Sequence, residues 1–220
     1  MKENYVLLGG WSRNTETYRN AVQTAPQKRN VYIIPHASLI PDIKIPSLSE
    51  INSRILQELE QKNLTNITLI GHSLGGVFAI SFTANYPEYV KELVLVDSEG
   101  IQDKRNFSIV VYNWLKDNLF VNGFAKAKEN IKALIRIVQN FPYYFVTARF
   151  AKNIDVRYDA KKIKTPTLIL WGEKDKVTTT KNAKEFTRLI KDSKLVILPG
   201  MDHDWLIHNP QELWKNINKG

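Results

Sequence analysis

Six short apolar runs constrain the fold of this chain more than any other feature. They are rich in β-branched residues, and five of the six lack the polar alternation of a half-exposed strand: Tyr5–Leu8, Val31–Ile34, Ile67–Ile70, Leu93–Val96, Thr167–Trp171 and Leu195–Leu198. Segments with apolar residues at helical spacing, such as Leu48–Leu59 and Ala183–Ile190, lie between them. This alternation is typical of a parallel sheet between layers of helices. The sequence therefore predicts an α/β fold with a mostly parallel sheet covered by helices on both faces.

One interval, residues 99–164, interrupts the alternation. It lacks a convincing strand, and its apolar residues recur instead at three- and four-residue steps: Phe124, Ala127, Ile131, Leu134, Ile135 and Val138. That spacing predicts an amphipathic helix. We expect a helical lid inserted into a single core, of which residues 1–98 form the first part and residues 165–220 the second. Residues 101–165 hold 13 Lys and Arg against 5 Asp and Glu, so most of the net charge of +9 is local to this interval.

The composition excludes several classes of protein. The chain has no cysteine, which excludes zinc fingers and redox dithiols. Its longest apolar stretches, such as Ile109–Tyr112, fall far short of the ~18 residues that a membrane-spanning helix needs. The polar start Met1–Asn4 and the short apolar run after it do not form a signal peptide. We therefore expect a cytoplasmic protein without a membrane span.

The sharpest chemical signal is the segment Gly71-His72-Ser73-Leu74-Gly75-Gly76, which directly follows an expected strand and precedes the apolar helix Val77–Tyr86. A sharp turn from strand to helix strains the backbone of the central serine, and small residues on either side prevent collision across the turn. The hydroxyl would then stand exposed above the carboxyl ends of the strands, where open parallel sheets bind ligands. The pattern alone also fits a serine that caps a helix after a glycine turn.

Two downstream residues favour the catalytic interpretation. Asp175 follows the strand that ends at Trp171, and His203 follows the last strand, so both are expected at the same edge of the sheet as Ser73. The order Ser, Asp, His along the chain is that of the α/β-hydrolase fold. The sequence resembles lid-bearing α/β-hydrolases of the serine esterase and lipase type over nearly the whole chain except the lid. The matching stretches are Tyr5–Trp11, Ile67–Gly76, Thr165–Val177 and Leu195–Trp205.

The resemblance implies a role for each matching residue. Ser73 corresponds to the nucleophile, Asp175 to the acid and His203 to the base. The backbone N–H groups of Trp11 and Leu74 correspond to the donors of the oxyanion hole. Many relatives have His-Gly after the first strand where this chain has Gly9-Gly10, which leaves the orientation of the first donor less certain.

These roles predict hydrolysis of a carboxylic ester, thioester or amide through an acyl-enzyme, because His203 can take the hydroxyl proton as Ser73 attacks a carbonyl carbon. A C–C bond hydrolase or lyase would use the same residues, and a non-catalytic ligand-binding protein can share the fold. We expect no cofactor and no metal: the histidines lack ligand spacing, and Gly71–Gly76 lacks the ending of a phosphate-binding loop.

Other acidic residues and histidines compete for a place in the site. Asp97, at the end of the strand Leu93–Val96, is the alternative acid. Because neighbouring residues point apart, Asp202 and Asp204 are expected to be solvated or capping groups. Three histidines are expected to have other roles, as a residue that packs or bonds locally, a loop residue that could line the site entrance, and a surface residue of the final helix: His72, His36 and His208, respectively.

The lid gives the only indication of substrate and partners. Its aromatic residues would either wall an acyl-binding cleft or bury the lid against the core: Phe141, Tyr143, Tyr144, Phe145 and Phe150. Its cations are either a solvated face or a surface that attracts an anionic partner: Lys126, Lys128, Lys132, Arg136, Arg149, Lys152 and Arg157. The expected substrate is a small acyl ester, either free and anionic or linked to an acidic acyl carrier protein, as in the pimeloyl-ester esterases that the architecture resembles. Anionic lipid is a third candidate for the basic lid. No nucleic acid is expected, because aromatic residues suited to base stacking do not accompany the charge.

Overall fold

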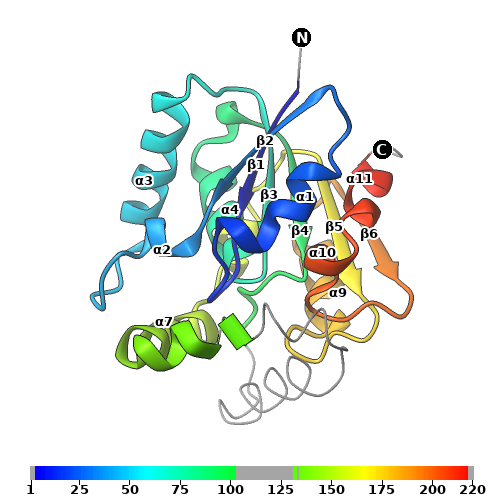
Figure 1. The fold of residues 1–220 in the computed structure, drawn as a ribbon. Coiled ribbons are helices and arrows are strands. Elements are labelled where there is room, and N and C mark those ends of the chain that lie inside the picture. The colour runs from blue at the N-terminus through cyan, green and yellow to red at the C-terminus, as the bar shows by residue number, and fades with distance from the viewer. Residues whose placement is uncertain (1–2, 103–130, 133, 218–220) are drawn as a thin grey trace.

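A single parallel sheet of six strands forms the centre of the molecule in the computed structural model, which describes residues 3–102, 131–132 and 134–217. The strand order is β2-β1-β3-β4-β5-β6 (Figure 1). All six expected strands are present, each extended by one to three residues: β1 (Glu3–Leu8), β2 (Arg29–Ile34), β3 (Ile67–His72), β4 (Val90–Val96), β5 (Thr167–Gly172) and β6 (Ser193–Leu198).

Two apolar clusters cover the two faces of this sheet, and β1 shows how the sequence divides between them. Val6 and Leu8 belong to one cluster, whereas Tyr5 and Leu7 belong to the other, because successive side chains of a strand point to opposite faces. The first cluster includes residues of α2 (His36–Leu39), α3 (Leu48–Gln61), α4 (Leu74–Asn85), α8 (Arg157–Ala160) and α9 (Thr180–Leu189). On the second face lie η1 (Thr15–Tyr18), α1 (Arg19–Gln23), α10 (Trp205–His208) and α11 (Gln211–Ile217). The predicted α/β architecture is therefore confirmed.

Local signals in the sequence explain where the main helices lie. Ser47 and Glu50 form a capping box that begins α3 at the residue where its apolar spacing starts. In contrast, α4 is buried from Leu74 through Thr83, as expected for a helix that is apolar on all sides. A short 3-10 helix, η2 (Pro87–Tyr89), connects α4 to β4. Because β3 leads directly into α4, the turn that carries Ser73 is enclosed by the best-buried part of the fold.

The strand register aligns the carboxyl ends of the central strands. His72 of β3 pairs with Val96 of β4, and Val96 pairs in turn with Leu170 of β5. The segments that follow these strands consequently start at the same edge of the sheet. This arrangement brings Ser73, Asp97 and the turn after Gly172 close together.

Helix α7 (Phe141–Asn153) lies at that carboxyl edge of the sheet (Figure 1). The described residues 131–132 and 134–139 are also helical, as the apolar spacing predicts. Phe124, Ala127, Lys126 and Lys128 lie outside the described residues. The division into a core of residues 1–98 and 165–220 and a lid of residues 99–164 remains a prediction. None of the helices within the described ranges has the length and apolar character that crossing a membrane requires.

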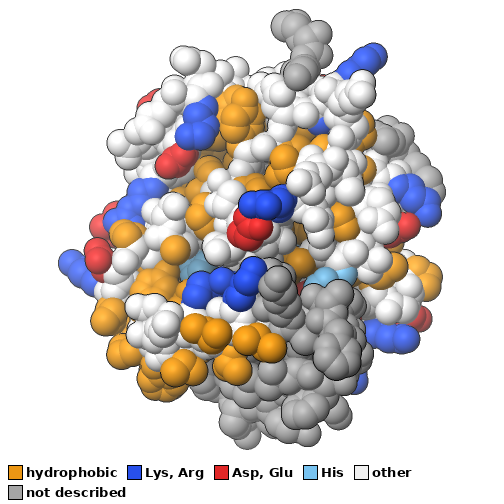
Figure 2. All heavy atoms as spheres, viewed as in Figure 1, with side chains coloured by type: hydrophobic (Ala, Val, Ile, Leu, Met, Phe, Trp, Pro, Cys, Tyr) orange, Lys and Arg blue, Asp and Glu red, His pale blue; other side chains and the backbone are white. Residues whose placement is uncertain are grey.

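The described residues of the predicted lid divide into a packed group and an exposed group. Tyr144 is buried, and Tyr143 and Phe150 pack against the core. Phe141 and Phe145 are 58% and 41% exposed, so these two do not bury the lid. Exposure also extends to apolar residues of the preceding helical segment: Ile131, Ile135 and Val138. Figure 2 shows hydrophobic side chains gathered over α7, with Lys and Arg side chains beside them.

Candidate active site

Ser73 occupies a strained turn between β3 and α4. Its φ of 53° lies in the left-handed region, which a residue with a side chain adopts only when its surroundings hold it there. Ser73 N donates to Val96 O (3.0 Å), and Glu99 N donates to Ser73 O (3.0 Å). A Cβ at Gly75 would lie 2.0 Å from the carbonyl oxygen of Leu8, so only glycine fits there. Ser73 is 7% exposed, which corrects the expectation that its hydroxyl stands exposed.

His203 lies between Ser73 and Asp175. Its Nε2 is 3.0 Å from Ser73 Oγ, and its Nδ1 is 2.8 Å from Asp175 Oδ2. All three residues are buried. The turns after β5 and β6 contact each other directly, since Lys174 N donates to Met201 O (2.8 Å). The structure thus brings together the serine, histidine and aspartate that the sequence singled out.

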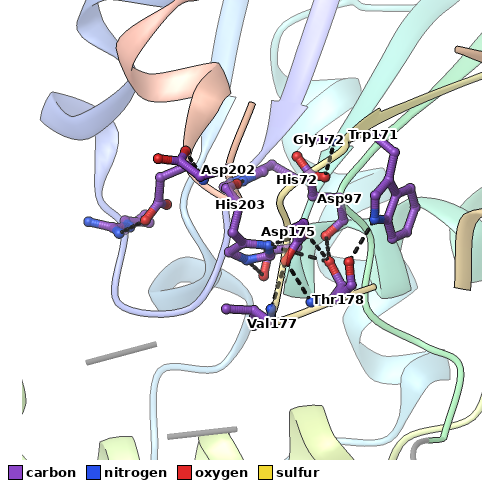
Figure 3. A network of polar contacts seen from close by, with 12 residues as sticks. His72, Asp97, Trp171, Gly172, Asp175, Val177, Thr178, Asp202 and His203 are labelled. Atoms are coloured by element: carbon purple, nitrogen blue, oxygen red, sulfur yellow. Dashed lines mark hydrogen bonds and ion pairs between the residues drawn. The ribbon is translucent and has the colours of Figure 1, made fainter. Parts of the chain in front are cut away.

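Asp175 is fixed by donors from its own turn, as Figure 3 shows. Val177 N and Thr178 N donate to Oδ1 (2.7 and 2.9 Å), and Thr178 Oγ1 donates to Oδ2 (2.6 Å). These bonds leave Oδ2 directed at His203. Sequence reasoning missed Thr178, although a threonine three residues after an aspartate in a turn is a recognisable signal for such bonds.

The protonation of His203 follows from its neighbours. A carboxylate oxygen only accepts, so Nδ1 carries the proton that bonds Asp175, and Nε2 is left to accept the serine proton. Burial alone lowers the pKa of His203, but the negative charge and hydrogen bond of Asp175 outweigh burial and raise the pKa above its usual value. The arrangement therefore favours the protonated form of His203.

Asp97, the alternative acid, lies beside Asp175 and is fully buried (Figure 3). Its Oδ1 accepts from Gly172 N (2.8 Å), whereas the carboxylate of Asp175 contacts the imidazole. Burial and then the charge of Asp175 raise the pKa of Asp97 well above its usual range. Because the carboxylate of Asp175 contacts the imidazole and that of Asp97 bonds the backbone of Gly172, the geometry favours Asp175 as the acid.

The two expected oxyanion-hole donors belong to segments that adjoin Ser73. Leu74 is the first residue of α4, so its N–H has no acceptor within the helix. Trp11 follows β1 and Gly10, and a Cβ at Gly10 would lie 3.1 Å from Ser73 Cβ, so this loop passes directly against the serine. Trp11 Nε1 also donates to Thr147 Oγ1 of α7 (2.9 Å), which joins the loop to the lid. The roles of Trp11 and Leu74 as donors remain predictions.

The acidic residues beside His203 differ from each other. Asp202 is partly buried, and its Oδ1 accepts from Asp204 N (3.2 Å) in the turn before α10. The expectation for Asp204 was wrong: it is buried and pairs with buried Arg13 at 2.7 Å. Burial would raise the pKa of Asp204, but the Arg13 guanidinium lowers it below its usual value. Arg13 comes from the loop after β1, so local sequence could not reveal this partner.

The other three histidines also differ from their expectations. His72 is buried and bonds Tyr18 and the backbone of His203, so its contacts are not local. His36 begins α2 rather than lying in a loop, and burial lowers its pKa to about 4. It packs beside the rings of two lid tyrosines: Tyr143 and Tyr144. His208 is partly buried on α10 and is not on the final helix.

The three described arginines of the predicted lid contact the protein itself. Arg136 donates to the carbonyl oxygen of Ser12 (3.1 Å), Arg149 lies 6.0 Å from the centre of the Phe145 ring, and Arg157 pairs with Asp155 and Glu185. Within the described ranges, no three His, Asp or Glu side chains are grouped so as to hold a metal ion.

Comparison with known proteins identifies the family and fold. A family model described as serine aminopeptidase, S33 matches residues 48–211. The pimeloyl-[acyl-carrier protein] methyl ester esterase of Wigglesworthia glossinidia brevipalpis is 28% identical over 232 residues, covering 94% of this chain and 89% of that protein. The 2-hydroxy-6-oxononadienedioate/2-hydroxy-6-oxononatrienedioate hydrolase 1 of Pseudomonas putida is 27% identical over 188 residues, covering 71% and 64%. The solved structure of MGS-MChE2, an alpha/beta hydrolase enzyme from a sediment metagenome of the Mar Chica lagoon, Morocco, has a TM-score of 0.76 and 24% identity, covering 100% of this chain and 90% of that one.

Proposed function

Because the chain belongs to the serine aminopeptidase S33 family of α/β-hydrolases, we propose that it cleaves a carboxylic ester or thioester through an acyl-enzyme on Ser73. One observation carries the proposal: Ser73 Oγ, His203 and Asp175 form a continuous buried contact, with distances of 3.0 and 2.8 Å. A serine hydroxyl is a weak nucleophile at neutral pH, and a base within hydrogen-bond distance removes that limitation.

Acylation begins when Ser73 Oγ attacks the carbonyl carbon and its proton moves to His203 Nε2. The negative charge that develops on the carbonyl oxygen is met by the N–H groups of Leu74 and Trp11, each worth roughly 3 kcal/mol of barrier. The imidazolium returns its proton to the leaving alkoxide or thiolate as the carbon–oxygen or carbon–sulfur bond breaks. Asp175 stabilises the imidazolium throughout and keeps its own charge.

Deacylation repeats these steps with water as the nucleophile. His203 takes a proton from water as the water oxygen attacks the acyl carbon, and then returns it to Ser73 Oγ as the ester bond to the serine breaks. The product is a carboxylic acid, and the enzyme recovers its starting protonation. No cofactor enters this sequence of steps.

For the substrate we favour an acyl ester that is anionic or linked to an acidic carrier. The relative from Wigglesworthia is named for an acyl-carrier-protein ester, and residues 101–165 of this chain hold 13 Lys and Arg against 5 Asp and Glu. Excess positive charge near the site raises the local concentration of an anionic substrate. We expect kcat/KM to fall with added salt for acidic esters but not for neutral ones. An equal response of both classes would remove the support for an anionic substrate.

Labelling with a fluorophosphonate tests the function directly. We expect the probe to modify Ser73, and both Ser73→Ala and His203→Ala to abolish labelling and hydrolysis of p-nitrophenyl esters. Ser53→Ala is the matched control, because Ser53 is exposed on α3 and bonds only its own helix. Persistent labelling of Ser73→Ala would contradict the proposal. Labelling without turnover of any acyl ester would instead favour C–C bond hydrolysis, the reaction class suggested by the Pseudomonas relative.

A further inference from the structure

A buried chain of hydrogen bonds runs behind Ser73 and joins three segments of the site. Gly10 N donates to the hydroxyl of Tyr18 (2.8 Å), and this hydroxyl contacts His72 Nδ1 (2.7 Å). On the far side of the ring, His72 Nε2 lies 3.2 Å from the backbone carbonyl oxygen of His203. Tyr18 and His72 are both buried. The proposed mechanism uses neither side chain.

The number of protons available on these groups fixes the donor and the acceptor of each hydrogen bond. The carbonyl oxygen of His203 only accepts, so His72 Nε2 must carry a proton. A neutral imidazole has one N–H, so Nδ1 is bare and accepts the hydroxyl proton of Tyr18. The hydroxyl oxygen in turn accepts from Gly10 N. Each donor has one acceptor, and the chain runs from Gly10 through Tyr18 and His72 to His203.

The two ends of this series of hydrogen bonds lie next to residues that the proposed mechanism uses. Gly10 directly precedes Trp11, the expected oxyanion donor, and passes against Ser73. His72 directly precedes Ser73, and the carbonyl oxygen at the other end belongs to the base, His203. We propose that Tyr18 and His72 are positioning residues, which fix the Gly10 loop and the backbone of His203 relative to Ser73. This inference rests on the proposed function of Ser73 and His203.

The surroundings of His72 keep it neutral, as the proton count requires. Its ring centre is 5.5 Å from that of His203, and Tyr18, Asp204 and Arg13 are the other ionisable groups around it. Burial, followed by the positive charge of protonated His203, lowers the pKa of His72 to about 4. The single N–H of His72 therefore stays on Nε2 when His203 takes a proton during the reaction.

An ion pair also connects the loop after β1 with the loop after β6, independently of Tyr18 and His72. Arg13, on the loop after Gly10, pairs with Asp204, the residue after His203, at 2.7 Å. Tyr18→Phe keeps the ring volume and this ion pair while it removes the hydroxyl. We therefore expect this variant to fold and to lose alignment of the site.

The test compares Tyr18→Phe and His72→Gln with the wild-type protein at a temperature where all are folded. We expect Tyr18→Phe to lower kcat for a p-nitrophenyl ester by about 10- to 100-fold, because small displacements of reacting groups have effects of this size. KM should change less than about twofold, since the aligned groups act after substrate binding. Tyr5→Phe is the matched control: Tyr5 OH bonds Glu3, at the opposite end of β1.

A double-mutant cycle separates positioning from simple destabilisation. Tyr18 and His72 belong to one series of hydrogen bonds, so the double variant should lose little more activity than the less active single variant. His72→Gln can still donate an amide proton to the His203 carbonyl oxygen and should retain more activity than His72→Ala. Kcat values for Tyr18→Phe and His72→Gln within twofold of wild type would overturn the proposal, as would fully additive losses.

A second measurement, which does not depend on activity, tests this inference independently of the proposed function. Nitrogen NMR of the imidazole rings should show His72 with its proton on Nε2 and no titration between pH 5 and pH 8. A proton on Nδ1, or titration in that range, would overturn the inference whatever the activity. If the wild-type protein is neither labelled at Ser73 nor active on esters, the proposed function fails, and this NMR result still decides the structural claim.

Discussion

The carboxyl edge of the sheet and the lid above it are built differently. At the sheet edge, Ser73, Asp175 and His203 are buried, and each has a partner at hydrogen-bond distance. On the lid, Phe141, Val138 and Ile135 are about half exposed or more. The contrast shows that the proposed catalytic residues are held by the packed core, whereas part of the predicted lid presents apolar side chains to solvent. Substitutions should therefore change kcat or stability at the sheet edge and mainly KM on the lid.

The largest effect should separate the two carboxyl groups at the sheet edge. Asp175→Asn should lower kcat by about 10⁴-fold, because the imidazole loses its charged partner. Asp97→Asn should lower kcat by less than about tenfold, since Asp97 bonds Gly172 N rather than the imidazole and an amide oxygen can still accept that bond. Steady-state kinetics of the two variants, in which the same carboxyl-to-amide replacement is made at each position, provides the comparison. A larger loss in Asp97→Asn would reverse the assignment of the acid.

Replacing Arg13 tests whether the buried Arg13–Asp204 ion pair at the sheet edge stabilises the folded protein. Arg13→Met leaves Asp204 buried without its cation and should lower the free energy of unfolding by about 3 to 5 kcal/mol. The pKa of Asp204 is lowered in the folded protein, so the contribution of the pair is complete above pH 3.8 and is lost as the pH falls through the folded-state value. Urea unfolding at several pH values measures both effects. A loss below 1 kcal/mol at pH 7 would show that the pair is not essential to the site's rigidity.

The pH dependence of kcat/KM tests the electrostatic coupling within the site. In the proposed mechanism only neutral His203 is active, so activity should fall as the pH is lowered through the pKa of His203. Asp175 raises this pKa, so the midpoint should lie above the ordinary 6.5. Asp175→Asn removes the raising charge, so the midpoint of the residual activity should move to lower pH. An unchanged midpoint would mean that Asp175 acts by orientation alone.

The smallest effect on stability should come from the exposed lid. Phe141→Ser should change the free energy of unfolding by less than about 0.5 kcal/mol, as is usual for surface positions. Phe82→Ala in the core is the contrasting control, with a loss of about 3 to 5 kcal/mol expected for a fully buried phenylalanine. A loss of more than 1 kcal/mol in Phe141→Ser would remove the distinction between the lid surface and the core. Esters of several chain lengths should show a KM change in the same variant.

The sequence predicted the fold and the central three residues because both depend on local patterns. Apolar runs of β-branched residues gave the strands, and the positions of Ser73, Asp175 and His203 just after three of them placed these residues at one edge. The Arg13–Asp204 pair and the Tyr18–His72 bond could not be predicted, since they join segments 191 and 54 residues apart. Such contacts depend on how loops approach each other after folding.

The lid shows a second limit of sequence patterns. Helical spacing correctly placed residues 134–139 in a helix, but it does not say whether an apolar stripe is covered. Burial of Tyr144 and exposure of Phe145 follow from which side of α7 faces the core, the side on which Thr147 accepts a hydrogen bond from Trp11. Thr178 is a different case, because its distance of three residues from Asp175 was visible in the sequence.

Trapping the acyl-enzyme tests the central claim most directly. The protein is mixed with p-nitrophenyl acetate, quenched in acid during the initial burst, digested and examined by mass spectrometry. We predict one acetyl group on the hydroxyl of Ser73 in the wild-type protein, and none in His203→Ala under the same conditions. Release of p-nitrophenol with the acetyl group on another residue, or acetylation of Ser73 at an undiminished rate in His203→Ala, would contradict this account.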